Sequence, residues 1–494
     1  MPPHNIANDL EDIYQADRKL LEKTALPIIT VSANYAEDLK GLHRRPELDK
    51  GTDIVLSRAH YSMALGVAVA AWGDKIDPKK AWLVDSTNYV SQNDLKSVRL
   101  THAIGKTIAR FSILKSLKDL VDRFGRSKMP ILDNVTPPTL YLGAGLNKPI
   151  LSMHIVTGNI LANEGKKVLQ MITDPHVRGD YLLNANLPNL RFLVFDEATK
   201  TEFFEVAKKI GKKIPASQLA DKVVVTGPPI DPRIVACHLD KAIYDNDRPL
   251  RICITTGGLG TNKEEIKKIL KQLLPVIKAQ TLGQINSLPP VELMFYAGTH
   301  ADHLRMAQEL AAENQLAIQT INPKDPANFK IGGKLNQDSS IDKQDRRRFF
   351  VLYHPQIVDA NELLIQHAFP WADLFISKPS GDMAYDAAAS GAALLTLKEW
   401  GDWEHNVRAT FESLEVSQVA ETENIVEQLA KLSFSQDNGI KSKAPISGQR
   451  PVPQLKEQKQ EAWISKAMSK AQNLPKKYYQ GAENILKEYY KIES

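Results

Sequence analysis

Short apolar segments alternate with longer amphipathic ones along this chain, and the alternation stops near residue 249 and then starts again. We expect the strands of the first series at 53–57, 80–85, 150–154, 168–173, 191–195 and 222–226. We expect those of the second at 250–255, 291–297, 317–320, 348–353, 374–377 and 393–397. Helical periodicity fills the gaps, as at 61–72, 100–124 and 263–280. This pattern predicts two doubly wound α/β domains, each binding ligands at the carboxyl ends of its parallel strands.

The chain has 494 residues, enough for two hydrophobic cores. Changes in composition set the boundaries that we expect. These are an N-terminal extension at 1–50, a first Rossmann-like domain at 51–246, a second at 247–432, a linker at 433–453 and a helical tail at 454–494. The linker is rich in Pro, Ser, Lys and Gln, which favours an irregular connection.

The net charge of +5 is unevenly distributed. From residue 441 onward there are eleven Lys and Arg against five Asp and Glu, so the rest of the chain is close to neutral. A near-neutral body argues against a nucleic-acid-binding surface spread over the domains. The longest apolar stretch, 63–72, is far below the roughly 20 residues of a membrane span. With only Cys237 and Cys253 and no signal-like start, the sequence predicts a cytoplasmic protein.

The first motif is ITTGGLGTN, which follows an expected strand and opens an expected helix. Gly257, Gly258 and Gly260 let the backbone approach a ligand closely, and the free N–H groups of a helix start favour a phosphate. The alternative is an ordinary tight connection between a strand and a helix.

The second motif is SKPSGDMAYDAAASG, again at the junction of a strand and a helix. Lys378, Ser380 and Gly381 form a small-residue turn aimed at an anion, and Asp386 lies one or two turns into the helix. The alternative is a capped helix with an acidic residue near its positive end.

Together these motifs resemble the K-P-G-G…E signature of the GT-B glycosyltransferases related to the peptidoglycan N-acetylglucosaminyltransferase and to the processive diacylglycerol glycosyltransferases. The resemblance implies that Ser380 and Gly381 replace the glycine pair at the nucleotide diphosphate, and that Asp386 contacts the ribose. The segment KEWGDWEHN is similar to the family's P-G-Q-E…N segment, which implies that Glu404 and Asn406 reach the donor sugar. Trp400 and Trp403 either line the sugar site or close the edge of the domain.

The first half is similar to the family more loosely. DIVLSRAHYSMALG places His60 where the family has a G-G-G-H-like loop, although Ser57, Arg58 and Ala59 replace the glycines. His60 is the expected general base on an acceptor hydroxyl, and the alternative is a structural histidine or cap. MITDPHVRGDY resembles the family's T-D segment and makes Asp174 and His176 second candidates for base or acceptor contact. KVVVTGPPIDPRI resembles its closing strand.

The function that the resemblance implies is metal-independent, inverting transfer of a sugar from a UDP-sugar to a hydroxyl acceptor, with a lipid as the candidate acceptor. The D-x-D string 245–247 is interpreted as a linker rather than a metal site, and no cofactor is expected. The basic, aromatic tail predicts peripheral contact with an anionic membrane at its inner face, and the alternative is packing on the N-terminal domain. Two other functions stay open, a nucleotide-sugar 2-epimerase of the same fold and a non-catalytic binding protein.

Overall fold

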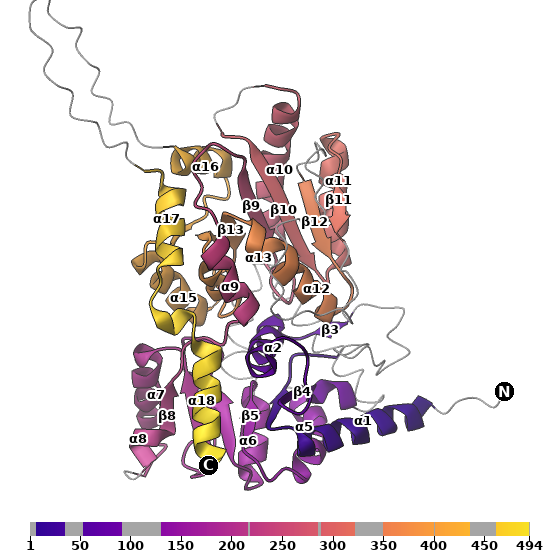
Figure 1. The fold of residues 1–494 in the computed structure, drawn as a ribbon, viewed down its shortest axis with the longest axis vertical. Coiled ribbons are helices and arrows are strands. Elements are labelled where there is room, and N and C mark those ends of the chain that lie inside the picture. The colour runs from indigo at the N-terminus through magenta and orange to yellow at the C-terminus, as the bar shows by residue number, and fades with distance from the viewer. Residues whose placement is uncertain are drawn as a thin grey trace, which may run out of the picture.

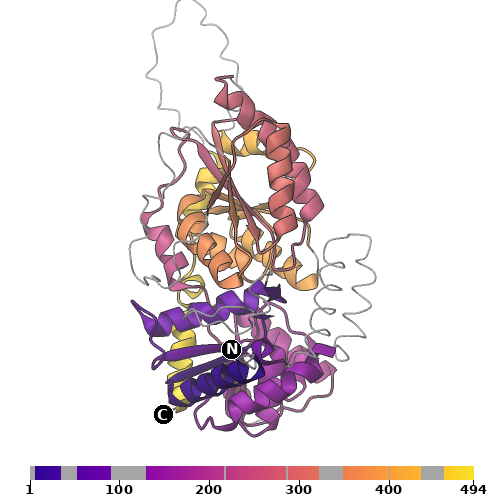
Figure 2. The same ribbon diagram turned by 90° about the vertical axis from the view of Figure 1, so that its right-hand side faces the viewer.

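The computed structural model describes residues 6–34, 53–90, 130–215, 218–284, 288–321, 349–399, 401–434 and 461–493. They form two α/β domains stacked along the long axis of the molecule (Figure 1). The turned view shows helices on both sides of the C-terminal sheet (Figure 2). The expectation of two doubly wound domains is confirmed.

The N-terminal domain is built on a six-stranded parallel sheet with the order β4-β1-β5-β6-β7-β8. Its strands are β1 (Leu26–Thr30), β4 (Ala81–Asp85), β5 (Ile150–Ser152), β6 (Val168–Met171), β7 (Leu190–Val194) and β8 (Val223–Val225). The helices of this half are α1 (Ile6–Lys23), α2 (Arg58–Trp72), α5 (Pro130–Ala144), α6 (Ile155–Asn163), α7 (Glu197–Lys209), α8 (Leu219–Lys222) and α9 (Pro232–Asp240). These strands are largely apolar because helices cover both faces of a parallel sheet.

The first strand of this sheet lies earlier than the sequence pattern predicts. We expected it at 53–57, but only β3 (Ile54–Val55) forms there, and it pairs antiparallel with β2 (Ala33–Asn34) outside the sheet. Strand β1 lies inside the sheet between β4 and β5, and it comes from the segment that we assigned to an N-terminal extension, so the boundary at residue 51 is wrong. Pro27 within β1 is the physical reason, because a proline argues against a central strand. The helix expected at 100–124 lies outside the described residues.

The C-terminal domain has a seven-stranded parallel sheet with the order β11-β12-β10-β9-β13-β14-β15. Its strands are β9 (Leu250–Thr255), β10 (Val291–Gly298), β11 (Gln319–Ile321), β12 (Phe349–Tyr353), β13 (Leu374–Ser377), β14 (Ala393–Thr396) and β15 (Ser417–Val419). Its helices are α10 (Lys263–Thr281), α11 (Ala301–Glu313), α12 (Ile357–Leu363), α13 (Phe369–Trp371), α14 (Met383–Ala389), α15 (Asp402–Ser413) and α16 (Ile425–Ser433). Here all the strands expected from the sequence are found within one to three residues of their expected bounds.

The two helices of the tail join the domains. Helix α17 (Trp463–Gln472) packs on the C-terminal domain, and α18 (Gly481–Glu493) crosses back to pack on α2 of the N-terminal domain (Figure 1). The side chains of Ile485 and Tyr489 are fully buried there. The single hydroxyl proton of Tyr489 is shared between the carbonyl oxygens of Ala25, 3.0 Å from Oη, and Pro149, 2.7 Å from Oη. The structure therefore uses these tail residues for packing and not as an apolar face toward a membrane.

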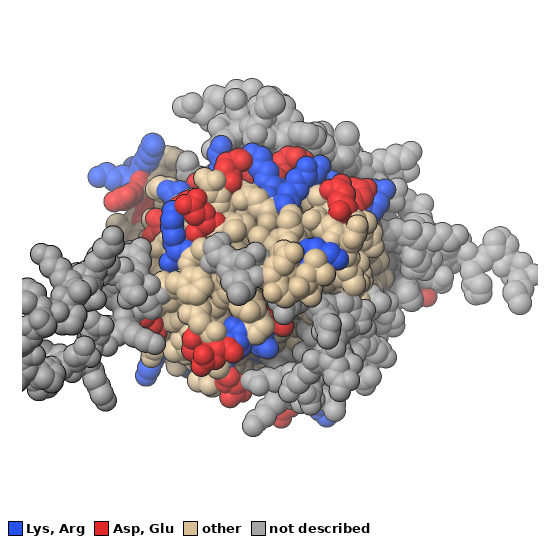
Figure 3. All heavy atoms as spheres, turned by 90° about the horizontal axis from the view of Figure 1, so that it is seen from above, with Lys and Arg blue, Asp and Glu red and all other residues tan. Residues whose placement is uncertain are grey.

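The described part of the chain contains no helix that is both long and apolar enough to cross a membrane. Seen from the end of the C-terminal domain, Lys and Arg side chains lie among Asp and Glu side chains, and the coloured residues form no large area of one sign (Figure 3). The linker at 433–453 lies almost entirely outside the described residues.

Candidate functional site

A cavity of about 290 Å³ lies between the two domains. The N-terminal domain lines it with residues 56–60, His154, Thr173, Asp174 and Arg178. The C-terminal domain lines it with residues 256–259, Thr261, Ser377, Lys378, residues 380–383 and Trp403. These residues follow β5, β6, β9 and β13 or begin α2 and α14, so the cavity lies at the carboxyl ends of both sheets. Both sheets also change winding direction here, because β1 lies between β4 and β5, and β9 lies between β10 and β13.

The start of α2 fixes His60 in the cavity. Ser57 caps the helix, and its Oγ accepts from the backbone N–H of His60 at 3.4 Å. The His60 ring places Nδ1 3.3 Å from the carbonyl oxygen of Val31 and Nε2 3.2 Å from Thr173 Oγ1. A carbonyl oxygen only accepts, so Nδ1 holds the proton and Nε2 is the acceptor. Burial lowers the pKa of His60 to about 4, so the ring is neutral at pH 7.

Two candidate residues follow β6, the acid Asp174 and the histidine His176, and one of them reaches the cavity. Asp174 lines it, and burial raises the pKa of its carboxyl. His176 is not among the lining residues, and its Nδ1 lies 2.8 Å from Glu202 Oε1 on the N-terminal domain. The structure therefore brings Asp174 to the cavity with His60 but does not bring His176 there.

Two of the three glycines in the first motif line the cavity. Gly257 and Gly258 face it, whereas Gly260 turns the chain ahead of α10 at a φ of 69°. A Cβ on Gly258 would lie 2.8 Å from the backbone nitrogen of Arg58, in the other domain. The absence of a side chain at 258 thus serves the contact between domains as well as the approach to a ligand.

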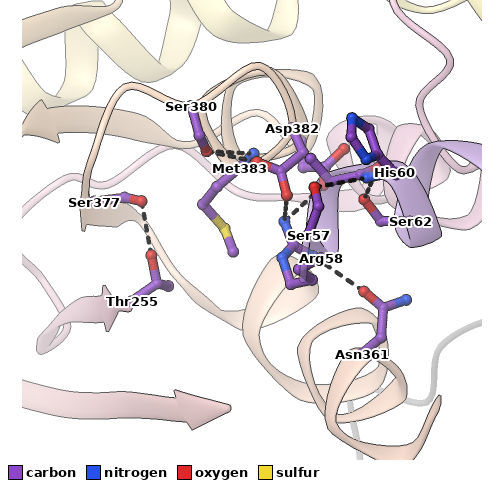
Figure 4. Close-up of polar contacts among 12 residues, drawn as sticks. Ser57, Arg58, His60, Ser62, Thr255, Asn361, Ser377, Ser380, Asp382 and Met383 are labelled. Atoms are coloured by element: carbon purple, nitrogen blue, oxygen red, sulfur yellow. Dashed lines mark hydrogen bonds and ion pairs between the residues drawn. The ribbon is translucent and has the colours of Figure 1, made fainter. Parts of the chain in front are cut away.

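The second motif forms a capped turn with a fixed cation. Ser380 Oγ accepts from the backbone N–H of Met383 at 3.2 Å, at the start of α14 (Figure 4). Lys378 Nζ lies 2.7 Å from Glu404 Oε1, and Glu404 is fully buried. Burial lowers the pKa of Lys378, but Glu404, Asp382 and Asp174 together raise it above its ordinary value, so this lysine stays charged. Glu404 therefore positions Lys378 and does not itself line the cavity.

Two more predicted donor residues connect the domains in this structure. A Cβ on Gly381 would lie 2.7 Å from both Asp174 Oδ1 and the carbonyl oxygen of Thr173. Asn406 Nδ2 donates to the carbonyl oxygen of Pro175 at 3.0 Å. Gly381 lines the cavity and Asn406 does not.

Arg58 was not singled out from the sequence as a functional residue, although it replaces a glycine of the G-G-G-H-like loop in the glycosyltransferases that the sequence resembles. Its guanidinium crosses the interface, lies 2.6 Å from Asp382 and donates to Asn361 Oδ1 at 3.0 Å (Figure 4). It also lies 3.6 Å from Asp386. Burial raises the pKa of Asp386 to about 8. At Asp382 burial also raises the pKa, but Arg58, the hydrogen bonds of Ser380 and Met383, and Lys378 together lower it below its ordinary value. Asp386, the expected ribose contact, lies behind this ion cluster and not at the cavity wall.

His154 and Arg178 also line the cavity and were missed. His154 ends an expected strand and Arg178 lies in the T-D segment, so position at a strand end was the available signal. The D-x-D string instead forms a turn outside the cavity, where the backbone N–H of Asp247 donates to Asp245 Oδ1 at 3.1 Å. Within the described ranges, no three His, Cys, Asp or Glu side chains are grouped as metal ligands.

No protein-family model and no curated protein sequence matches this chain. Among solved structures it is similar to MurG of Acinetobacter baumannii, with 12% identity, a TM-score of 0.36 and coverage of 82% of this chain and 88% of that one. It is also similar to MnaA of S. aureus solved with UDP, with 11% identity, a TM-score of 0.45 and coverage of 95% and 97%. An α,α-trehalose-phosphate synthase (UDP-forming) of Burkholderia vietnamiensis gives 12% identity, a TM-score of 0.41 and coverage of 94% of each chain.

Proposed function

We propose that this protein is a glycosyltransferase that moves a sugar from a nucleoside diphosphate sugar, with UDP as the expected carrier, to a hydroxyl group of an acceptor. The observation that supports this most is the make-up of the interdomain cavity. On one side a neutral His60 offers an acceptor nitrogen beside Asp174, and on the other two turns and Lys378 offer anion-binding groups.

The reaction that fits is a single displacement. The acceptor hydroxyl gives its proton to His60 Nε2 while its oxygen forms a bond to the anomeric carbon. The bond from that carbon to the diphosphate oxygen breaks, and the leaving group departs with the electron pair. The N–H groups at Gly257 and Gly258, the capped turn at Ser380 and the Lys378 ammonium are placed to stabilise the negative charge that develops. One displacement inverts the anomeric configuration, and no step in it requires a metal ion.

Donor entry requires the two domains to separate. The cavity of about 290 Å³ lies at the lower limit of ligand pockets, about 300–1,000 Å³, so it is small for a nucleotide sugar. Separation would withdraw Arg58 from Asp382 and Asp386 and expose both carboxylates. Asp386 would then be available for the ribose contact that the resemblance implies.

A lipid acceptor reached at a membrane surface is our proposal for the second substrate. The support is the resemblance together with exposed lysines on the tail, Lys476, Lys477, Lys487 and Lys491. Each basic residue near an anionic surface contributes up to about 1 kcal/mol. Co-sedimentation with phosphatidylserine vesicles at low and high salt tests this, and absence of binding at low salt would exclude it.

The catalytic assignment is tested by substituting His60. His60→Ala should lower turnover, measured as UDP release from a panel of UDP-sugars, by about 10²–10⁴-fold while UDP binding is retained. His176→Ala is the matched control, because it removes a histidine of the same domain that lies outside the cavity. Near-normal turnover in folded His60→Ala would transfer the role of base to Asp174. A wild-type rate that EDTA abolishes and manganese restores would contradict the metal-independent mechanism.

A further inference from the structure

The end of β5 brings a second histidine into the cavity, next to the proposed base. His154 lines the cavity, and its ring centroid lies 4.8 Å from that of His60 at an interplanar angle of 77°. His154 begins α6, and His60 lies in the first turn of α2, so two separate elements hold the pair. Both rings are partly exposed, as a site for a small ligand requires.

The hydrogen bonds of the two rings give them opposite roles. His154 Nδ1 accepts from the backbone N–H of Val156 at 3.2 Å, as the N-cap of α6. In a neutral ring the proton therefore lies on Nε2, which has no hydrogen-bond partner among the described residues. His60 has its proton on Nδ1 and accepts at Nε2. Burial, His60 and Arg178 lower the pKa of His154 well below its ordinary value, so both rings are neutral.

Charged groups of both signs share the cavity with the pair. Arg178 lines the cavity, and its positive charge lowers the pKa of both imidazoles. Asp174 and Asp382 line it as well, and the charge of Asp382 acts on His60 in the opposite direction. What distinguishes the pair is therefore its neutral groups, one hydrogen-bond acceptor and one donor.

We propose that His60 and His154 form an acceptor subsite for an alcohol that has a second oxygen atom on the adjacent carbon, as in a sugar or a glycerol derivative. The reacting hydroxyl donates to His60 Nε2 in place of the Thr173 hydroxyl, which can turn to Tyr181 Oη at 3.3 Å. The neighbouring oxygen accepts from His154 Nε2–H. His154 is a binding residue in this scheme and leaves the proton transfer to His60. The inference rests on the proposed glycosyl transfer for the meaning of "acceptor", whereas the recognition of the two oxygens rests on the positions and hydrogen bonds of the two rings.

The cap on α6 explains only one nitrogen of His154. It accounts for Nδ1 and for the presence of a capping residue, for which Asn or Ser would serve as well. The cap does not require the Nε2–H group of this residue, which lines the cavity. His154→Asn is therefore an informative variant, because asparagine can keep the cap while it removes the ring donor.

The test compares trans-1,2-cyclohexanediol with cyclohexanol, which differ by the second oxygen. Protein with ¹⁵N-labelled histidine is titrated with each compound, with and without saturating UDP, and the ring nitrogens are followed by NMR. Before titration we expect the Nδ1–H tautomer at His60 and the Nε2–H tautomer at His154. The diol should bind about five- to tenfold more tightly than the alcohol, which is the contribution of one hydrogen bond. His154→Asn should remove this preference, and His176→Asn should retain it.

Equal affinity of the wild-type protein for diol and alcohol would overturn the proposal, as would the reverse tautomer at His154. These results do not need the variant to fold. Retained preference in folded His154→Asn would overturn it as well. Absence of UDP binding in the same samples would instead contradict the proposed glycosyl transfer. The preference for the diol could still be measured in the protein without UDP.

Discussion

The guanidinium of Arg58 lies 2.6 Å from the carboxylate of Asp382, and the two residues belong to different domains. Both side chains are buried, and Asn361 and Asp386 complete the cluster. Arg58 begins α2 two residues before His60, and Asp382 precedes α14 two residues after Ser380. The ion pair therefore links the segment of the proposed base to the segment of the proposed diphosphate turn, and closure of the cleft sets the distance between them.

Arg58→Ala should destabilise the protein by about 3–5 kcal/mol, because it leaves the buried carboxylate of Asp382 without its cation. Urea unfolding gives the measurement. Lys263→Ala is the control, since Lys263 lies 2.7 Å from Asp302 but both are about one-quarter exposed. That variant should cost less than about 1 kcal/mol. Similar losses in the two variants would mean that the Arg58 cluster does not hold the domains together.

Gly381→Ala should force the domains apart, because its Cβ would lie 2.7 Å from Asp174 Oδ1 and from the carbonyl oxygen of Thr173. We expect a loss of about 1–3 kcal/mol, the usual cost of overpacking. Small-angle scattering and urea unfolding together show both effects. Gly179→Ala should change neither, since no atom lies closer than 3.8 Å to its added Cβ. A Gly381→Ala protein with unchanged shape and stability would refute the close contact.

Tyr489→Phe should cost about 0.5–1.5 kcal/mol, because it removes the hydroxyl that bonds to the carbonyl oxygens of Ala25 and Pro149. The neighbouring Tyr490 is 42% exposed, so Tyr490→Phe should be close to neutral. Thermal unfolding of the two variants makes the comparison. Equal stability would contradict the packing of α18 on the N-terminal domain and return this helix to the membrane interpretation.

Acid should weaken the fold through His60. Burial lowers the pKa of this histidine to about 4 in the folded protein, whereas the unfolded chain titrates near 6.5. Between these values the unfolded state binds more protons, so the free energy of unfolding falls as the pH drops below 6.5. From pH 7.5 to pH 5 the wild type should lose about 2 kcal/mol more than His60→Gln, as one pKa unit corresponds to about 1.36 kcal/mol. An identical pH dependence of the two proteins would place His60 in a solvated environment.

The sequence was sufficient to predict the strands of the second domain and many residues of the cavity wall. The bounds of β13 were predicted to the residue, because a short apolar run ending at a small-residue turn is a strong local signal. The same signal located Lys378, Ser380 and Gly381 in the cavity wall. Strand β1 was missed because Pro27 is unfavourable in a central strand, and only the surrounding sheet overrides that preference.

The contacts between the two domains could not be predicted from the sequence. Arg58 and Asp382 are 324 positions apart in the chain, and nothing local indicates that they meet. Asp386 and Glu404 were expected at the donor, yet the structure places them against Arg58 and Lys378. Their side chains fit the resembling motif, and only the packing of the two domains shows which neighbours they take.

Isothermal titration of the intact protein with UDP, and in parallel with ADP, GDP and TDP, tests the central claim most directly. The account predicts one site per chain with a preference for UDP, and weaker UDP binding by about 1–3 kcal/mol in Lys378→Ala, which loses a charge-assisted contact to the diphosphate. Failure of all four nucleotides to bind folded wild-type protein, or UDP binding that Lys378→Ala leaves unchanged, would contradict a nucleotide-sugar site in this cavity.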